Sequence, residues 1–224
     1  PYMAVGTDLL FAAVTKAGGT FSFARQQLVP WRVVLSLCAG SVPSAGVTLW
    51  VLHTVGPSDP DVQKVMTFTL GVALLLTASA MLYKAIRGKK APQALNDDTL
   101  PQATQPRHWA LPVLFGAVIG TLVTLTSVGA GAIGVTVLMI LYPQLPLARI
   151  IAADIAYAVP LTLVAGLGHA SLGSVDWSLL SLLLAGSLPG IWLGSRLTHK
   201  TPERVIRSIL SLLLAWAGSK LVFA

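Results

Sequence analysis

The sequence predicts an all-α, polytopic membrane protein, and three observations carry this prediction: the composition, the length of the apolar runs and an internal repeat. Hydrophobic residues make up 54% of the 224 positions and charged residues only 10%, whereas a soluble domain carries about 25% charged residues. So little charge suits a surface that faces hydrocarbon. The net charge of +7 comes from lysines and arginines that lie mostly in short loops, where they indicate topology rather than nucleic-acid binding.

Six apolar runs are long enough for a helix of about 20 residues that crosses the hydrocarbon core. These runs are residues 3–22, 31–53, 62–86, 148–168, 177–198 and 203–223. The region 109–142 differs, because the Gly-rich break TSVGAGAIG at 126–134 divides it into two arms. Neither arm is comfortably long enough to cross alone, so we expect a hairpin or a re-entrant element here.

The positive charges predict the orientation of the helices. Twelve of the fifteen lysines and arginines lie in one set of loops, namely Arg25, Arg32, Lys84, Arg87, Lys89, Lys90, Arg107, Arg149, Arg196, Lys200, Arg204 and Arg207. By the positive-inside rule this set is cytoplasmic, and the hairpin 109–142 then starts and ends on the cytoplasmic side. The polar, Pro-rich linker 88–107 is predicted to be cytoplasmic and to join a first repeat, 1–87, to a second, 108–224.

The two halves match without gaps at an offset of 146. Aligned in this way are Asp8 with Asp154, Phe11 with Tyr157, Trp31 with Trp177, and Ala39-Gly40-Ser41-x-Pro43 with Ala185-Gly186-Ser187-x-Pro189. The charge rule sends the runs 3–22 and 148–168 in opposite directions, so the repeat is inverted. Inverted repeats are typical of secondary transporters with a binding site at the repeat interface, although some channels also have them.

The repeat also predicts a segment that this chain does not contain. The counterpart of the hairpin 109–142 would fall at −37 to −4 (109 − 146 and 142 − 146). We therefore expect the first repeat to lack its N-terminal hairpin, which would have a Gly-rich break of its own.

Two acidic residues within the apolar runs are candidates for proton coupling. Asp8 and Asp154 occupy matching positions of the repeat. A charged group inside a membrane costs about 2.5–3.5 kcal/mol on insertion scales, and such groups commonly relay protons. The alternative is a structural role in helix packing or at a helix end, above all for Asp154, which lies within about two turns of its helix start.

Candidate anion-binding groups lie in the first run and in the break. Lys16 is the only basic residue well inside a span and either contacts an anionic substrate or snorkels to the cytoplasmic interface. The break offers backbone N–H groups and hydroxyls at the start of a second helix, where anions bind, or it forms a simple tight turn. Its candidate residues are Thr126, Ser127, Gly129, Ala130 and Gly131.

The repeated AGSxP motif supplies two further candidates. Ser41 and Ser187 are predicted to donate hydrogen bonds into a substrate cavity, although a packing kink is the simpler role for a motif with glycine and proline. No catalytic, metal or cofactor site is predicted. Cys38 is the lone cysteine, which excludes a CxxC site, and no HExxH or GxGD motif occurs.

The motifs of both halves resemble a known family. The segments GTDLL…KAGG…VPW…AGSVP and TSVGAGAIGVTVL…AADIAYAVPLTLVAGLGHASLGSVDW…AGSLPGIWLGSRL are similar to the sulfite exporter TauE/SafE family, also called the toluene-sulfonate uptake permease family. The likeness covers nearly the whole chain except the linker. It implies a multi-pass protein of the bacterial inner membrane that moves sulfite, organosulfonates or related anions, and it implies an N-terminal Gly-rich segment.

Residues and resemblance together predict a secondary transporter of a small sulfur-containing anion, in which Asp8 or Asp154 exchanges a proton. The first alternative is a passive anion channel on the same scaffold, and the less favoured one is an intramembrane enzyme. The expected partners are the small anionic substrate and the lipid bilayer, without nucleic acid. A homo-oligomer is compatible with the sequence.

Overall fold

The computed structural model describes residues 2–56, 59–87, 110–128 and 131–198, together with 208, 212–213, 215–216 and 219–220. The elements within these residues are α1 (Tyr2–Arg25), α2 (Trp31–Val55), α3 (Pro60–Arg87), α4 (Ala110–Thr126), α5 (Ala132–Leu141), α6 (Leu147–Ser171) and α7 (Trp177–Thr198). The predicted all-α fold is confirmed. The linker 88–107 and most of the predicted run 203–223 lie outside the described residues.

The helices follow the apolar runs closely, because each run ends where polar or helix-breaking residues begin. Within the described part of the chain, three helices are long and apolar enough to cross a membrane: α2, α3 over Pro60–Ser79, and α6. Shorter apolar helices are α4 and the stretch Trp177–Ser187 of α7. Helix α1, which carries Asp8 and Lys16, is not among them, although it has 24 residues.

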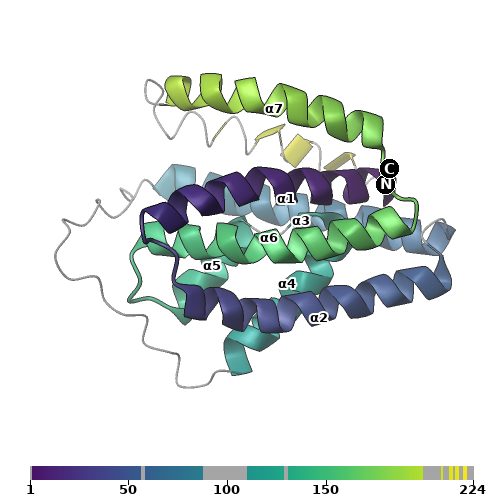
Figure 1. Cartoon of the computed structure of the whole chain (residues 1–224), viewed down its shortest axis with the longest axis horizontal. Coiled ribbons are helices and arrows are strands. Elements are labelled where there is room, and N and C mark those ends of the chain that lie inside the picture. Colours follow the sequence, from purple (N-terminus) through teal and green to yellow (C-terminus); the bar gives the residue numbers. More distant parts are fainter. Residues whose placement is uncertain are drawn as a thin grey trace.

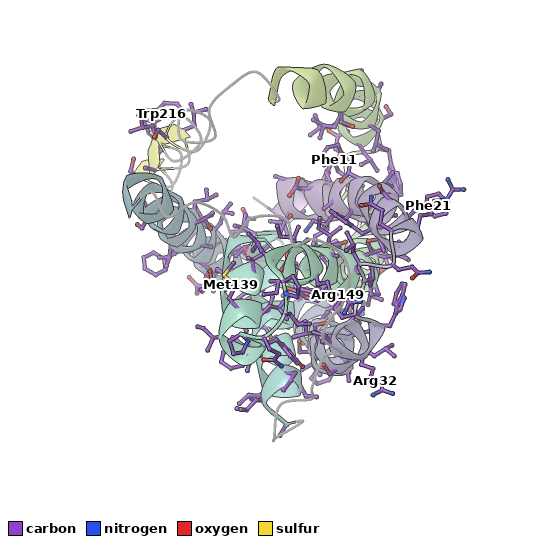
Figure 2. The ribbon with its side chains drawn as sticks, turned by 90° about the vertical axis from the view of Figure 1, so that its left-hand side faces the viewer. Phe11, Phe21, Arg32, Met139, Arg149 and Trp216 are labelled. Atoms are coloured by element: carbon purple, nitrogen blue, oxygen red, sulfur yellow. The ribbon has the colours of Figure 1, made fainter. Side chains whose placement is uncertain are left out.

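Helices α1 and α6 form an antiparallel pair (Figure 1). Three facing pairs define its register, namely Gly6 with His169, Leu10 with Gly166 and Gly19 with Ile155. Helix α2 packs against both α4 and α6, α7 packs against α1, and α3 contacts α4 and α5. Figure 2, which looks along the helices, shows Phe11 between α1 and α7, while Phe21 and Arg32 point away from the bundle.

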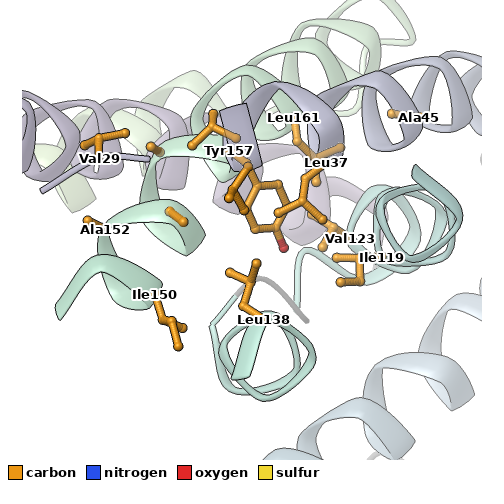
Figure 3. Close-up of a cluster of buried hydrophobic side chains, with 14 of the residues drawn as sticks. Val29, Leu37, Ala45, Ile119, Val123, Leu138, Ile150, Ala152, Tyr157 and Leu161 are labelled. Carbon is orange, nitrogen blue, oxygen red and sulfur yellow. The ribbon is translucent and has the colours of Figure 1, made fainter. Parts of the chain in front are cut away.

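The helix bounds follow the offset of the repeat. Helix α1 ends at residue 25 and α6 at residue 171, and α2 begins at residue 31 and α7 at residue 177, so each pair is 146 positions apart (171 − 25 and 177 − 31). In Figure 1 each of these two pairs runs in opposite directions. The core cluster lies mainly where α1, α2, α4, α5 and α6 meet. Tyr157 is at the centre of the view in Figure 3.

Close approach between α2 and α4 depends on glycine. A Cβ on Gly40 would collide with the Val113 carbonyl oxygen, and one on Gly120 would collide with the Ser41 carbonyl oxygen. The short distance lets the Ser44 hydroxyl donate a hydrogen bond across the interface to the Ala117 carbonyl at 2.8 Å. Small residues commonly let helices pack this closely in membranes, where lipid supplies little hydrophobic drive for helix association. The glycine of the AGSxP motif in α2 is therefore a packing residue.

Replacing Gly120 by Ala is expected to force α2 and α4 apart, because the new methyl group meets backbone atoms that cannot turn away. The expected loss of unfolding free energy is about 1–3 kcal/mol, as for other overpacked sites. Thermal unfolding in detergent measures it. Gly46→Ala is the matched control, since nothing lies within 4 Å of a Cβ there and its stability should change by less than about 0.5 kcal/mol. Equal effects of the two variants would contradict close packing at Gly120.

Candidate functional site

The backbone between α4 and α5 is irregular, and this break interrupts an otherwise apolar hairpin. Helix α4 ends at Thr126, whose hydroxyl lies 2.6 Å from the Leu122 carbonyl oxygen and accepts a hydrogen bond from the Val128 N–H at 3.2 Å. Ser127 adopts the left-handed conformation, with φ of 61°. A hydroxyl that forms hydrogen bonds with nearby backbone groups competes with the backbone hydrogen bonds of the helix, so the helix ends here. The candidates Gly129 and Ala130 lie outside the described residues.

The hydroxyl of Ser127 donates a hydrogen bond to the carboxylate of Asp8 on α1. Asp8 is exposed in the described chain. The residues are 119 positions apart in sequence, so this contact joins the first half of the chain to the hairpin of the second. The structure therefore brings together two residues that sequence reasoning proposed for different roles.

Asp154 lies on the other side of the break and is 3% exposed. The backbone of Gly131, the residue before α5, lies near its carboxylate, and a Cβ on Gly134 of α5 would collide with it. Its Oδ1 atom has no hydrogen-bond partner among the described residues. Asp154 therefore contacts the start of α5, while Asp8 contacts the end of α4.

Lys16 lies between these two carboxylates in the register of α1 and α6. Asp8 is level with Gly166–His169 of α6, and Asp154 lies about 20 Å further along that helix at 1.5 Å per residue. The Lys16 ammonium is near enough to interact electrostatically with both carboxylates. No ion pair within 4 Å joins Lys16 to either of them in the described structure. Lys16 thus places a positive charge near the polar groups of the break, and this charge forms no direct ion pair with Asp8 or Asp154 in the described structure.

Ser41 and Ser187 occupy other places. Ser41 is fully buried in the α2–α4 contact, beside Gly120 of α4. Gly120 precedes Ser127 by seven residues, so Ser41 lies about 10 Å from the break along the axis of α4. Its hydroxyl has no hydrogen-bond partner among the described residues. The Ser187 hydroxyl donates to the Leu184 carbonyl of its own helix, α7, at 3.1 Å.

His169 is a residue whose role sequence reasoning missed. Its position near the end of an apolar run is typical of an interfacial side chain, yet the side chain is fully buried. Its Nε2 lies 2.9 Å from the Thr124 carbonyl oxygen, so Nε2 carries the hydrogen. This carbonyl belongs to the last turn of α4, where the helix supplies no N–H of its own. His169 thus fixes the end of α4 to α6, and no feature of the sequence distinguishes it from an interfacial histidine.

Comparison with known proteins gives a consistent result. The family model described as "Sulfite exporter TauE/SafE" matches residues 1–221. The chain is 31% identical over 231 residues to the probable membrane transporter protein YjnA of Bacillus subtilis, covering 99% of this chain and 85% of that protein. It is 26% identical to the probable membrane transporter protein YdhB of the same organism, covering 99% and 85%. No solved structure shows significant similarity to the chain.

His169→Leu is expected to leave the buried Thr124 carbonyl without a donor and to lower the unfolding free energy by about 1–3 kcal/mol. His169→Gln keeps an N–H donor and should recover part of that loss. The measurement is thermal unfolding in detergent. His53→Leu is the control, because His53 is exposed at the end of α2. If His53→Leu and His169→Leu destabilise the protein equally, the hydrogen bond to Thr124 does not fix α4.

Proposed function

This chain belongs to the sulfite exporter TauE/SafE family of membrane proteins, and we propose that it is a secondary transporter of a small sulfur-containing anion such as sulfite or an organosulfonate. The observation that carries the proposal is the position of the α4–α5 break. The break lies between Asp8 and Asp154 and within the electrostatic reach of Lys16. Charged groups and irregular backbone at membrane depth mark a substrate or ion path.

The anion is bound at the break. Gly131 precedes α5 with φ of 137°, and the first N–H groups of a helix have no partner within the helix. These N–H groups and the positive end of the helix dipole favour an anion. Lys16 adds a full positive charge, and the hydroxyls of Thr126 and Ser127 add donors when they turn from their present partners. Ser187 and the Gly129–Ala130 backbone remain predicted contacts.

The inverted repeat provides the means of alternating access. The matching ends of α1 and α6, the matching starts of α2 and α7, and the opposite directions of the paired helices support the repeat. In transporters of this kind one repeat rocks against the other around a fixed site. The charge pattern places the linker 88–107 on the cytoplasmic side of a bacterial inner membrane, with the repeats 1–87 and 108–224 on either side of it in sequence.

A proton is the proposed coupling ion. Two ionised carboxylates near the break would repel an anion, so binding favours the protonation of at least one of them. Asp8 and Asp154 are the candidates.

Lys16→Gln is expected to raise the KM for sulfite uptake into proteoliposomes by at least about tenfold, since it removes the positive charge nearest the break. Lys64→Gln is the control for loss of one charge, because the Lys64 side chain is 79% exposed and pairs with its neighbour Asp61. Saturable uptake with counterflow supports a carrier. Ohmic current through single molecules would instead show the passive channel, and an unchanged KM would exclude Lys16 from the site.

The doubly substituted variant Asp8→Asn/Asp154→Asn is expected to lose the dependence of uptake on an imposed pH gradient. Sulfite counterflow, which moves no net proton, should remain. Asp61→Asn serves as the control, because the Asp61 side chain is 89% exposed at the start of α3. Uptake that still follows the pH gradient in the double variant would remove the proton role from both residues.

A further inference from the structure

Two buried polar atoms near the break have no hydrogen-bond partner among the described residues. They are Oδ1 of Asp154 and the hydroxyl oxygen of Tyr157. Both residues belong to α6, three positions apart, so their side chains lie on neighbouring positions of one face. Asp154 is 3% exposed and Tyr157 is fully buried. Buried polar atoms are nearly always paired, so a pair of unpartnered atoms in one place requires an explanation.

Both atoms face the same point on α5. A Cβ built on Gly134 would collide with Oδ1 of Asp154 and would lie 2.9 Å from the hydroxyl oxygen of Tyr157. The two oxygen atoms therefore lie close together against Gly134, and a methyl group there would displace one or both of them. Figure 3 shows the ring of Tyr157 among Leu37, Leu161 and Val123, with its hydroxyl directed toward the helix that carries Leu138.

We propose that Tyr157 is the positioning residue for proton exchange at Asp154, and that Asp154 is the residue that carries the coupled proton. Asp154 is protonated while α5 lies against it, since an ionised oxygen left buried and unpaired would be strongly unfavourable. When Asp154 releases its proton to water, the Tyr157 hydroxyl keeps its own proton and turns to donate a hydrogen bond to the carboxylate. This inference rests on the proposed proton-coupled transport.

The two repeats differ at this point, which makes the two aspartates unequal. Phe11 stands where the second repeat has Tyr157, and it packs against the cluster between α1 and α7 (Figure 2). Asp8 thus has no tyrosine one turn away, and its partner is the Ser127 hydroxyl instead.

The other titratable groups around the pair are few. Lys16 on α1 attracts the ionised form of Asp154, and on α2 the Cys38 thiol lies 3.9 Å from the Tyr157 backbone carbonyl oxygen. The segments Ala110–Thr126 and Ala132–Leu141 contain no titratable side chain. Tyr157 is therefore the neutral donor that faces the same point on α5 as Asp154.

The test uses the full chain in lipid bilayers and needs no substrate. Infrared difference spectra over a pH titration should show the carbonyl band of a protonated carboxyl group, and Asp154→Asn should remove that band. In Tyr157→Phe the midpoint of the titration should move to higher pH by about one unit, because the ionised form loses its donor; one unit is a tenfold change in proton concentration. Tyr142→Phe is the matched control, since Tyr142 is also buried but lies at the end of α5.

Two results overturn the proposal. A carbonyl band that survives in Asp154→Asn shows that another group carries the proton, and an unmoved midpoint in Tyr157→Phe shows that Tyr157 does not position it. Should Tyr157→Phe fail to fold, Gly134→Ala is expected to move the same midpoint, because its methyl group displaces the Asp154 carboxylate from its place beside the Tyr157 hydroxyl. Because the spectra need no anion, failure of sulfite transport would refute the proposed substrate and leave this result standing.

A transport measurement separates positioning from a merely structural role. In Tyr157→Phe, uptake of sulfite driven by a pH gradient should fall about tenfold while sulfite counterflow and KM stay within about twofold of the unsubstituted protein. If folded Tyr157→Phe loses both activities together, Tyr157 has a merely structural role, and that outcome also contradicts the proposal.

Discussion

The α4–α5 hairpin depends on the satisfaction of backbone groups that no helix pairs. At membrane depth water does not supply partners, so irregular backbone is stable only where protein groups take its hydrogen bonds. Helix α6 contacts both ends of the break: His169 donates to the Thr124 carbonyl at the end of α4, and the Asp154 carboxylate lies near the Gly131 backbone before α5. The two residues are 15 positions and about 20 Å apart along α6, so one helix holds both ends of the break.

Close helix packing makes these contacts available. Gly166 admits the Leu10 side chain between α1 and α6, and Gly40 and Gly120 bring α2 to the backbone of α4. Gly134 does the same for α5 and Asp154. A larger side chain at any of these positions would separate elements whose polar groups reach each other only at short distance. The residues that pack the bundle therefore also position the charged groups, and the site cannot be understood apart from the packing.

Hydropathy and glycine content were sufficient to predict the described helices and the break, since both follow from local sequence. The repeat register singled out Asp8 and Asp154, and the structure places both beside the break. The roles of His169 and Tyr157 could not be predicted, because an apolar run does not show which of its faces is turned inward. Both depend on partners that lie in other helices, 45 residues away for His169. Ser41 shows the converse: its motif suggested a cavity, whereas tertiary register places it in the α2–α4 contact.

Electrostatics connects the proposed proton to the proposed anion. Lys16 and Asp8 carry opposite charges, so together they leave the break close to neutral. An anion then adds one negative charge, and an ionised Asp154 would add a second in surroundings where like charges interact strongly. A bound anion therefore favours the proton on Asp154, and by linkage a proton on Asp154 favours the bound anion to the same degree. Coupling of this kind needs no contact between Asp154 and the anion. It requires only that water screens the charges of Asp154 and the anion poorly. The burial of Asp154 beside the start of α5 meets this requirement.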